Sequence, residues 1–340
     1  MTALFQKRKQ IFLKNKLAVF SLFFFILLTT LSFLAPLLAN EKPLLMRYQN
    51  KLFFPIFQNI TDKDLGGDLP TYADYTDSFT QKQIKEHGWM LMAPIPYGAE
   101  TVDYFSKSPF PLSPSAKHLL GTDDQGRDLL ARLLYSLRLS LLFGFLLTFL
   151  SSCAGFLIGA IQGYFGGRVD LAIGRFIEIW SSLPQLFILI ILAGFLKPTF
   201  FTLLIILVLF SWPNLTGVVR AEFLRVRGLD YIKAAKILGA SNTNLIFRHI
   251  LPNALIATIT YIPFVLSGAI VALSALDFLG LGLPPGTPSL GELVREAKEN
   301  LNAPWIGISI LILMTSLLAA LLLIGEGIRS ALNPYEKETQ

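Results

Sequence analysis

The sequence predicts an all-α polytopic membrane protein with six transmembrane helices and a long external insert between the first two. Of its 340 residues, 53% are hydrophobic and only 15% are charged, whereas soluble domains carry about 25% charged residues. Six apolar runs are long enough to cross a bilayer core of about 30 Å, in which backbone groups must pair within each helix. These runs are 17–38, 139–161, 175–196, 200–219, 254–276 and 305–326.

The first apolar run follows a basic cluster and could therefore be a secretory signal peptide. Its apolar stretch is longer than the roughly 7–15 residues typical of signal peptides. No clean small-residue cleavage site follows it. We therefore interpret it as an uncleaved transmembrane helix. The basic residues before it are Lys7, Arg8, Lys9, Lys14 and Lys16.

Lysine and arginine predict the orientation, because short cytoplasmic loops are enriched in them. The N-terminal tail and the 220–252 segment are the most basic parts between or beside the spans. We therefore expect both termini and this segment in the cytoplasm. The 39–138 stretch is too long for the rule to apply. The net charge of +6 does not indicate a nucleic-acid partner, because the basic residues gather at helix ends instead of forming one stripe.

The spans divide the chain into four predicted parts. These parts are the cytoplasmic tail and first helix 1–38, the external insert 39–120, the core of five transmembrane helices 121–330 with its cytoplasmic segment 220–252, and the cytoplasmic tail 331–340. The insert contains aromatic residues such as Tyr72 and Tyr75, and apolar positions alternate from Trp89 to Ile95. Since disordered segments carry few aromatics, we predict a small folded module with some strand instead of a loose loop.

The cytoplasmic sequence DYIKAAKILGASNTNLIFRHILP predicts two short helices joined at a glycine. Asp230 is expected to cap the first helix, and Gly239 to end it in the left-handed conformation. Ser241 can start the second helix, and Pro252 is expected to follow its end. A short amphipathic helix on the cytoplasmic side of a membrane protein indicates a docking site for a partner. Its apolar stripe comprises Tyr231, Ala234, Ala235 and Leu238.

Proline interrupts three of the predicted spans, at Pro184, Pro213 and Pro263. Each proline removes a backbone hydrogen bond and kinks its helix. Kinked helices around a central path suit a protein that opens to each side in turn, and kinks that only adjust packing remain an alternative. In the loop before the last span, Ser289 and Glu292 form a capping box for an amphipathic helix. Docking, gating and interfacial packing all remain open for that helix.

No motif indicates chemistry by this chain. There is no G-x-x-x-x-G-K-[ST] loop for nucleotide phosphates. His87, His118 and His249 lie far apart without metal-ligand spacing, and the single Cys153 excludes a disulfide within the chain. The middles of the spans hold no acidic residue, whereas a proton-coupled transporter usually needs one there. This absence weakens a secondary-active transporter of peptides or small solutes, which remains the alternative function. An enzyme is not expected.

The segment from Lys233 to Pro252 resembles the signature of integral permease subunits of binding-protein-dependent ABC importers. The match has an Ala-Ala pair, a glycine four positions later and a final Leu-Pro. Lys233 replaces the family's glutamate and His249 its usual isoleucine, so the partner's groove is expected to differ in charge. The ATPase-docking residues that the resemblance implies are Asp230, Tyr231, Lys233, Ala234, Ala235, Leu238, Gly239, Ala240, His249, Leu251 and Pro252.

Two further motifs resemble the peptide and nickel branch of this family. They are GTDDQGRD before the second span and DFLGLGLPP after the fifth. The insert is similar to that of permeases in the microcin C and muropeptide-type oligopeptide importers. The outer rim or gate that the resemblance implies comprises Gly121, Thr122, Asp123, Gly126, Arg127, Asp128, Asp277, Gly280, Gly282 and Pro284.

The resemblance also implies a fold, partners and a location. The fold would be that of a type I ABC importer permease in a bacterial inner membrane. The expected partners are ABC ATPase subunits, a second homologous permease subunit, an external solute-binding protein and a peptide substrate. ATP and Mg would be bound by the ATPases, and this chain would bind no cofactor or metal.

Overall fold

The computed structural model describes residues 2–66, 71–75, 77–104, 106 and 108–332. Two compact units divide the chain. The helical unit comprises residues 1–26, 140–285 and 314–340, and the insert unit comprises residues 27–139 and 286–313.

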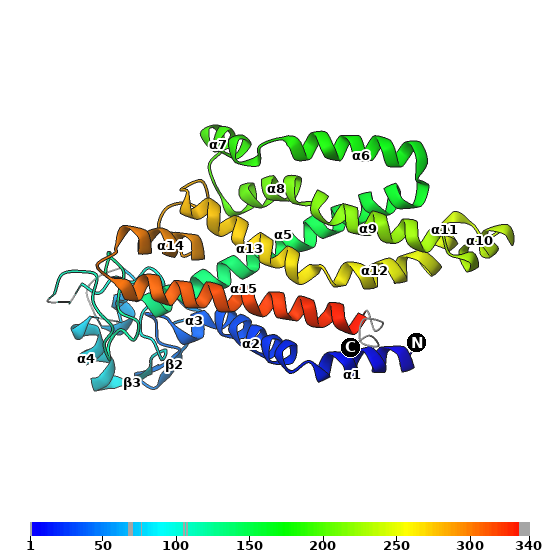
Figure 1. Cartoon of the computed structure of the whole chain (residues 1–340). Helices are drawn as coiled ribbons and strands as arrows, with labels where there is room; N and C mark the ends of the chain where they lie inside the picture. Colours follow the sequence, from blue (N-terminus) through cyan, green and yellow to red (C-terminus); the bar gives the residue numbers. More distant parts are fainter. Residues whose placement is uncertain (1, 67–70, 76, 105, 107, 333–340) are drawn as a thin grey trace. The chain divides into compact units, whose positions relative to one another are not determined.

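The helical unit contains most of the apolar helices (Figure 1). In Figure 1, α1, α10, α11 and the end of α15 lie at one end of this unit, and α7 and the end of α13 lie at the other. The helices that lie wholly or partly in this unit are α1 (Thr2–Lys14), α2 (Lys16–Phe33), α5 (Leu129–Phe165), α6 (Gly167–Ser182), α7 (Gln185–Phe195), α8 (Phe200–Ser211), α9 (Pro213–Arg227), α10 (Asp230–Ile237), α11 (Asn242–Asn244), the π-helical turn η2 (Leu245–Ile250), α12 (Leu251–Ile259), α13 (Ile262–Phe278) and α15 (Pro304–Leu332).

Within the described residues, four helical stretches are long and apolar enough to span a membrane. They are Lys16–Phe33, Leu129–Phe165, Phe200–Arg227 and Pro304–Leu332. A fifth candidate is α6 followed by α7, which are bent by 65° relative to each other. The remaining predicted span, 254–276, is divided between α12 and the 17-residue α13. The protein is thus a helical membrane protein with four or five candidate spans, where the sequence predicted six.

The breaks predicted at the three prolines are confirmed. The chain leaves helical geometry between α6 and α7, at Pro184. Pro213 begins α9, and Pro263 lies in the first turn of α13. A proline in a first turn loses no hydrogen bond, because the N–H groups there have no partner within the helix.

A row of glycines allows α5 and α9 to pack closely. Gly155, Gly159 and Gly163 recur every four residues on α5. A Cβ atom at Gly155 would lie 2.5 Å from the Trp212 carbonyl oxygen, and one at Gly159 would lie 2.6 Å from that of Thr216. Such small-residue rows bring helix backbones together in membrane proteins.

The insert unit holds a three-stranded antiparallel sheet in the order β2-β1-β3. The strand predicted from Trp89 onward is confirmed over Gly88–Leu91 (β3). The other elements of this unit are α3 (Ala35–Leu38), β1 (Leu45–Tyr48), β2 (Lys51–Phe53), the 3-10 helix η1 (Asp62–Leu65), α4 (Ser78–His87) and α14 (Leu290–Glu299). A small core lies among them, and it consists of Met46, Tyr48, Ile60, Leu65, Tyr75 and Ile84. The insert is therefore folded.

Candidate functional site

The predicted docking segment is held on the helical unit by a small apolar core. Ile232 of α10 is 3% exposed and packs in one cluster with Phe223 and Val226 of α9. Ala235 is half-buried against the same cluster. The Tyr164 hydroxyl of α5 donates to the Asn242 side chain at 2.6 Å. A displacement of α10 would therefore be transmitted to α9 through buried contacts.

The opposite face of α10 is apolar and exposed. Ile237 and Leu238 are 85% and 87% exposed, and Tyr231 and Ala234 are exposed beside them. We call these four residues the docking face. Ala234 follows Tyr231 by three positions, and Ile237 and Leu238 follow Ala234 by three and four, so all four lie on one side of the helix. Exposed clusters of large apolar side chains mark interaction sites. In the described part of the chain, the structure thus presents most of the predicted stripe outward.

The two ends of α10 differ in how well the sequence predicted them. Gly239 has φ +86°, and its N–H and that of Ala240 return to the carbonyls of Lys236 and Ala235, which confirms the predicted stop. The predicted cap is wrong. Leu229 occupies the capping position, and Asp230 is already the first helical residue. The Asp230 carboxylate instead accepts from the Lys233 ammonium at 3.1 Å, because the helix begins one residue earlier than predicted.

The second helix begins where the sequence predicted and ends elsewhere. Ser241 caps it by accepting from the Asn244 N–H at 3.3 Å. However, η2 continues directly into α12, so the predicted end before Pro252 is wrong. In the wider π turn, the Leu251 N–H donates to the Ile246 carbonyl. This turn allows the helix to continue past Pro252, which has no N–H to donate. His249 lies in this turn, with its ring 6.2 Å from that of Tyr231.

The predicted rim residues 121–128 form a tightly bonded turn in the insert unit. Asp123 accepts from the Arg127 guanidinium at 2.6 Å, and Asp128 contacts the buried His118 at 2.8 Å. Gly121 and Gly126 both have φ +81°, which favours glycine. The Thr122 carbonyl accepts from the Trp305 indole at 3.3 Å, and its hydroxyl accepts from the Leu112 N–H at 2.8 Å.

The other predicted rim residues form a turn in the helical unit. Asp277 is buried at the end of α13 and accepts from the Leu283 N–H at 2.7 Å. A Cβ atom at Gly282 would lie 1.8 Å from the Asp277 carboxylate, so only glycine fits there. Gly280 has φ +73°, and Pro284 is exposed. The two sets of rim residues thus belong to different units.

A buried ionic cluster within the insert unit, which the sequence did not predict, joins the turn at residues 121–128 to α14. Glu296 accepts from Arg132 at 2.6 Å and from Arg127 at 3.0 Å, and all three side chains are at most 5% exposed. The Arg132 guanidinium also lies 3.3 Å from Asp123. Glu296 follows Leu293 by three positions, so it shares the inward face of α14. That spacing was the signal available in the sequence.

Burial raises the pKa of Glu296 from its ordinary value of 4.5 to about 7, against the attraction of Arg132 and Arg127. An acid with a raised folded pKa binds more protons when folded, so stability falls as the pH rises from about 4.5 to about 7. We expect the melting temperature of the purified protein to fall over this window, and the fall to be smaller in Glu296→Gln. Equal slopes for the two proteins would contradict this assignment.

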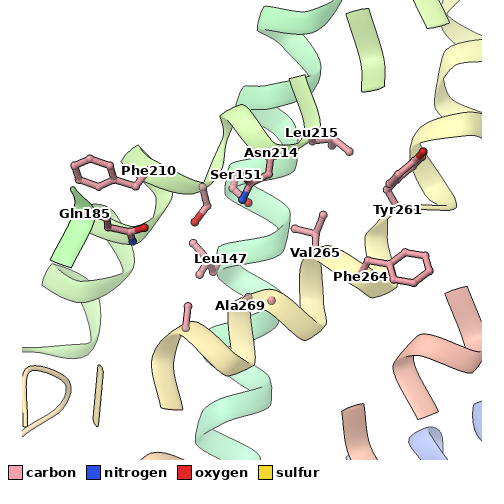
Figure 2. A pocket seen from close by; sticks show the side chains of 13 residues that line it. Leu147, Ser151, Gln185, Phe210, Asn214, Leu215, Tyr261, Phe264, Val265 and Ala269 are labelled. Atoms are coloured by element: carbon pink, nitrogen blue, oxygen red, sulfur yellow. The ribbon is translucent and has the colours of Figure 1, made fainter. Parts of the chain in front are cut away.

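A pocket of about 390 Å³ in the helical unit lies beside all three helix breaks (Figure 2). Gln185 follows Pro184, Asn214 follows Pro213, and Tyr261 and Phe264 flank Pro263. We call it the proline pocket. Figure 2 shows its lining extending from Gln185 and Phe210 on one side to Tyr261 and Phe264 on the other. Its polar side chains are amides and hydroxyls, and none of the lining residues that the structure describes is acidic or basic. Discontinuous membrane helices commonly line substrate sites.

Comparisons with known proteins identify the family. A family model described as a binding-protein-dependent transport system inner membrane component matches residues 155–335. A second, described as the N-terminal TM domain of oligopeptide transport permease C, matches residues 4–58.

Similar proteins agree with these models, and two of them match along nearly the whole chain. The inner membrane ABC transporter permease protein YejE of Escherichia coli is 49% identical over 97% of this chain and 96% of its own length. The peptidoglycan transport system permease protein YejE of Agrobacterium fabrum is 43% identical over 97% and 92%. The dipeptide transport system permease protein DppC of Haemophilus influenzae is 36% identical over 65% and 75%. The chain therefore belongs to the family of inner membrane permease components of binding-protein-dependent ABC transport systems.

Proposed function

We propose that this chain is a permease subunit of an ATP-driven importer of peptides, with oligopeptides and muropeptides as the substrate class. The docking face is the main support for this proposal. Ile237 and Leu238 are exposed on a helix that packs against α9, so a separate ATPase could bind them and move α9. The names of the relatives, which refer to peptidoglycan, dipeptide and ABC transport, support the substrate class.

In the proposed mechanism, two ABC ATPases bind the docking faces of this chain and of a second, homologous permease subunit. The ATPases hold ATP and Mg, and their closure pushes α10. Ile232 and Ala235 transmit this movement to α9 and to the helices broken at prolines. An external solute-binding protein delivers the peptide. The six-span topology of type I importers belongs to this proposal, with α12 and α13 together forming the span that is broken before Pro263.

The proposed orientation has both termini and the docking face in the cytoplasm. The basic N-terminal tail and 220–252 segment support it through the enrichment of lysine and arginine in cytoplasmic loops. The grouping of α1, α10, α11 and the end of α15 at one end of the helical unit also supports it (Figure 1).

The proline pocket would form part of the translocation path. Its neutral amides and hydroxyls can bond to peptide backbones without selecting for charge. A secondary-active transporter is disfavoured, because it would need an ionisable group at such a pocket. The Asp170 carboxylate at the start of α6, outside this pocket, is paired with the Arg220 guanidinium at 2.5 and 2.6 Å.

Uptake by a strain that lacks this chain tests the function. We expect loss of uptake of muropeptides, short peptides or peptide–nucleotide antibiotics, and recovery when the wild-type chain is restored. Asn214→Leu removes a hydrogen-bonding group from the pocket and should lower uptake about tenfold or more, the factor associated with 1.4 kcal/mol, with normal ATPase co-purification. Thr202→Leu, at a span residue outside the pocket, is the matched control. Unchanged uptake of every compound in the deletion strain would refute the function.

A further inference from the structure

A second cavity in the helical unit is lined by three arginines. It has a volume of about 420 Å³ and lies among α1, α9, α12 and α15. Arg8, Arg225 and Arg329 contribute guanidinium groups, and among the described lining residues only Glu222 contributes a carboxylate. Cavities of roughly 300–1,000 Å³ hold small-molecule ligands. Three arginines and one glutamate give the described lining a net charge of +2, which favours an anionic ligand.

The two carboxylates that the structure describes close to this cavity, Glu222 and Glu326, do not cancel its three positive charges. Glu222 is already bonded through both oxygens to Arg225. Glu326 lies 3.9 Å from Arg329, on an exposed turn. Among the residues that the structure describes, Arg8 forms no ion pair. Arginine presents a planar fork of donors that matches phosphate oxygens, so the chemistry of Arg8 and Arg329 in this lining suits a phosphate group.

The position of the cavity indicates where the phosphate comes from. Arg329 lies near the end of the apolar helix α15, and Arg225 lies near the end of the span Phe200–Arg227. Basic groups at the ends of spans lie at the level of lipid headgroups. The lining also includes the apolar Ile256 and Leu332, which can contact acyl chains. Basic pockets between membrane helices on the cytoplasmic side bind cardiolipin-type headgroups.

We propose that this cavity binds the phosphodiester headgroup of an anionic lipid and thereby fixes α1 and α15 to α9. The site does not depend on which substrate the importer carries. It goes beyond the proposed function and requires only that this end of the helical unit face an anionic leaflet.

Lipid retention by the purified complex tests the proposal. The complex is placed in phosphatidylcholine nanodiscs with added cardiolipin, and the bound lipid is measured by native mass spectrometry. Each basic residue near an anionic surface contributes about fivefold in affinity, so Arg8→Gln/Arg329→Gln should bind cardiolipin about 25-fold more weakly. Arg168→Gln, an exposed arginine at the start of α6 outside the lining, should bind as the wild type does. Arg329→Lys keeps the charge and should retain most of the binding.

Three outcomes would overturn the proposal. Equal retention by the double variant and the Arg168→Gln control would mean that the cavity does not bind the lipid. Displacement of cardiolipin from the wild type by millimolar inorganic phosphate would assign the site to a soluble phosphate. Loss of ATPase co-purification with unchanged lipid retention would show that the cavity is part of a protein interface.

Discussion

Ile237→Asp/Leu238→Asp is expected to abolish both ATPase co-purification and peptide uptake while leaving the chain folded and inserted. Both side chains are more than four-fifths exposed, and neither belongs to the core cluster that holds α10. Exposed substitutions of this kind usually change stability by about 0.5 kcal/mol or less. At the centre of an interface, truncating one hot-spot residue costs about 2 kcal/mol, or roughly thirtyfold in affinity. Two charges placed there would therefore prevent docking.

The matched control is Leu301→Asp, because Leu301 is an equally apolar side chain with 81% exposure in the insert unit. It should retain wild-type ATPase co-purification from tagged chain, measured by quantitative immunoblot. Membrane insertion of all variants is checked by fractionation. If the double variant keeps its ATPase and its uptake, the docking face has no role in coupling. If it loses uptake and keeps the ATPase, docking takes place on another surface.

Local chemistry made much of the fold predictable. Gly239 ends α10 because a left-handed residue is needed there, and glycine adopts that conformation without a steric cost. Pro184, Pro213 and Pro263 break their helices because proline lacks an N–H and clashes with the preceding turn. Aromatic residues in the insert likewise predicted a folded module, and of those named, Tyr75 lies in its core, whereas Tyr72 and Trp89 are exposed.

Helix boundaries were less predictable, because they depend on packing that the sequence does not display. The π turn before Pro252 places Leu245 and Ile250 in the same core as Val219 of α9. The capping rules for Asp230 and the usual effect of proline both favoured other boundaries. Tertiary contacts of Leu245 and Ile250 therefore favour a second helix that continues past Pro252.

The ionic cluster could not have been predicted from local patterns. Arg132 and Glu296 are 164 positions apart, and each lies in a segment whose charges would ordinarily face water. Only the fold of the insert unit brings them into contact. The spacing on α14 indicated that Glu296 faces inward, and its partner could not be inferred without the structure.

Arg132→Met is expected to destabilise the chain by about 3–5 kcal/mol, the usual cost of removing one partner from a buried ion pair. Glu296 would remain buried with only Arg127, which already neutralises Asp123. Because the total stability of a domain is about 5–15 kcal/mol, such a loss should lower the yield of folded protein and its melting temperature. The exposed pair of Arg175 with Glu178 provides the control: Arg175→Met should cost no more than about 1 kcal/mol.

The double variant Arg132→Met/Glu296→Leu separates the loss of an ion pair from the burial of an unpaired charge. It removes one positive and one negative group and leaves the contact of Arg127 with Asp123 at 2.6 Å. Replacing a buried pair with apolar side chains is often neutral or stabilising. We therefore expect the double variant to be more stable than Arg132→Met alone, by melting temperature of the purified complex. If the stability losses of Arg132→Met and Glu296→Leu simply add in the double variant, the two residues act independently. The contacts between them would then contribute no coupling energy.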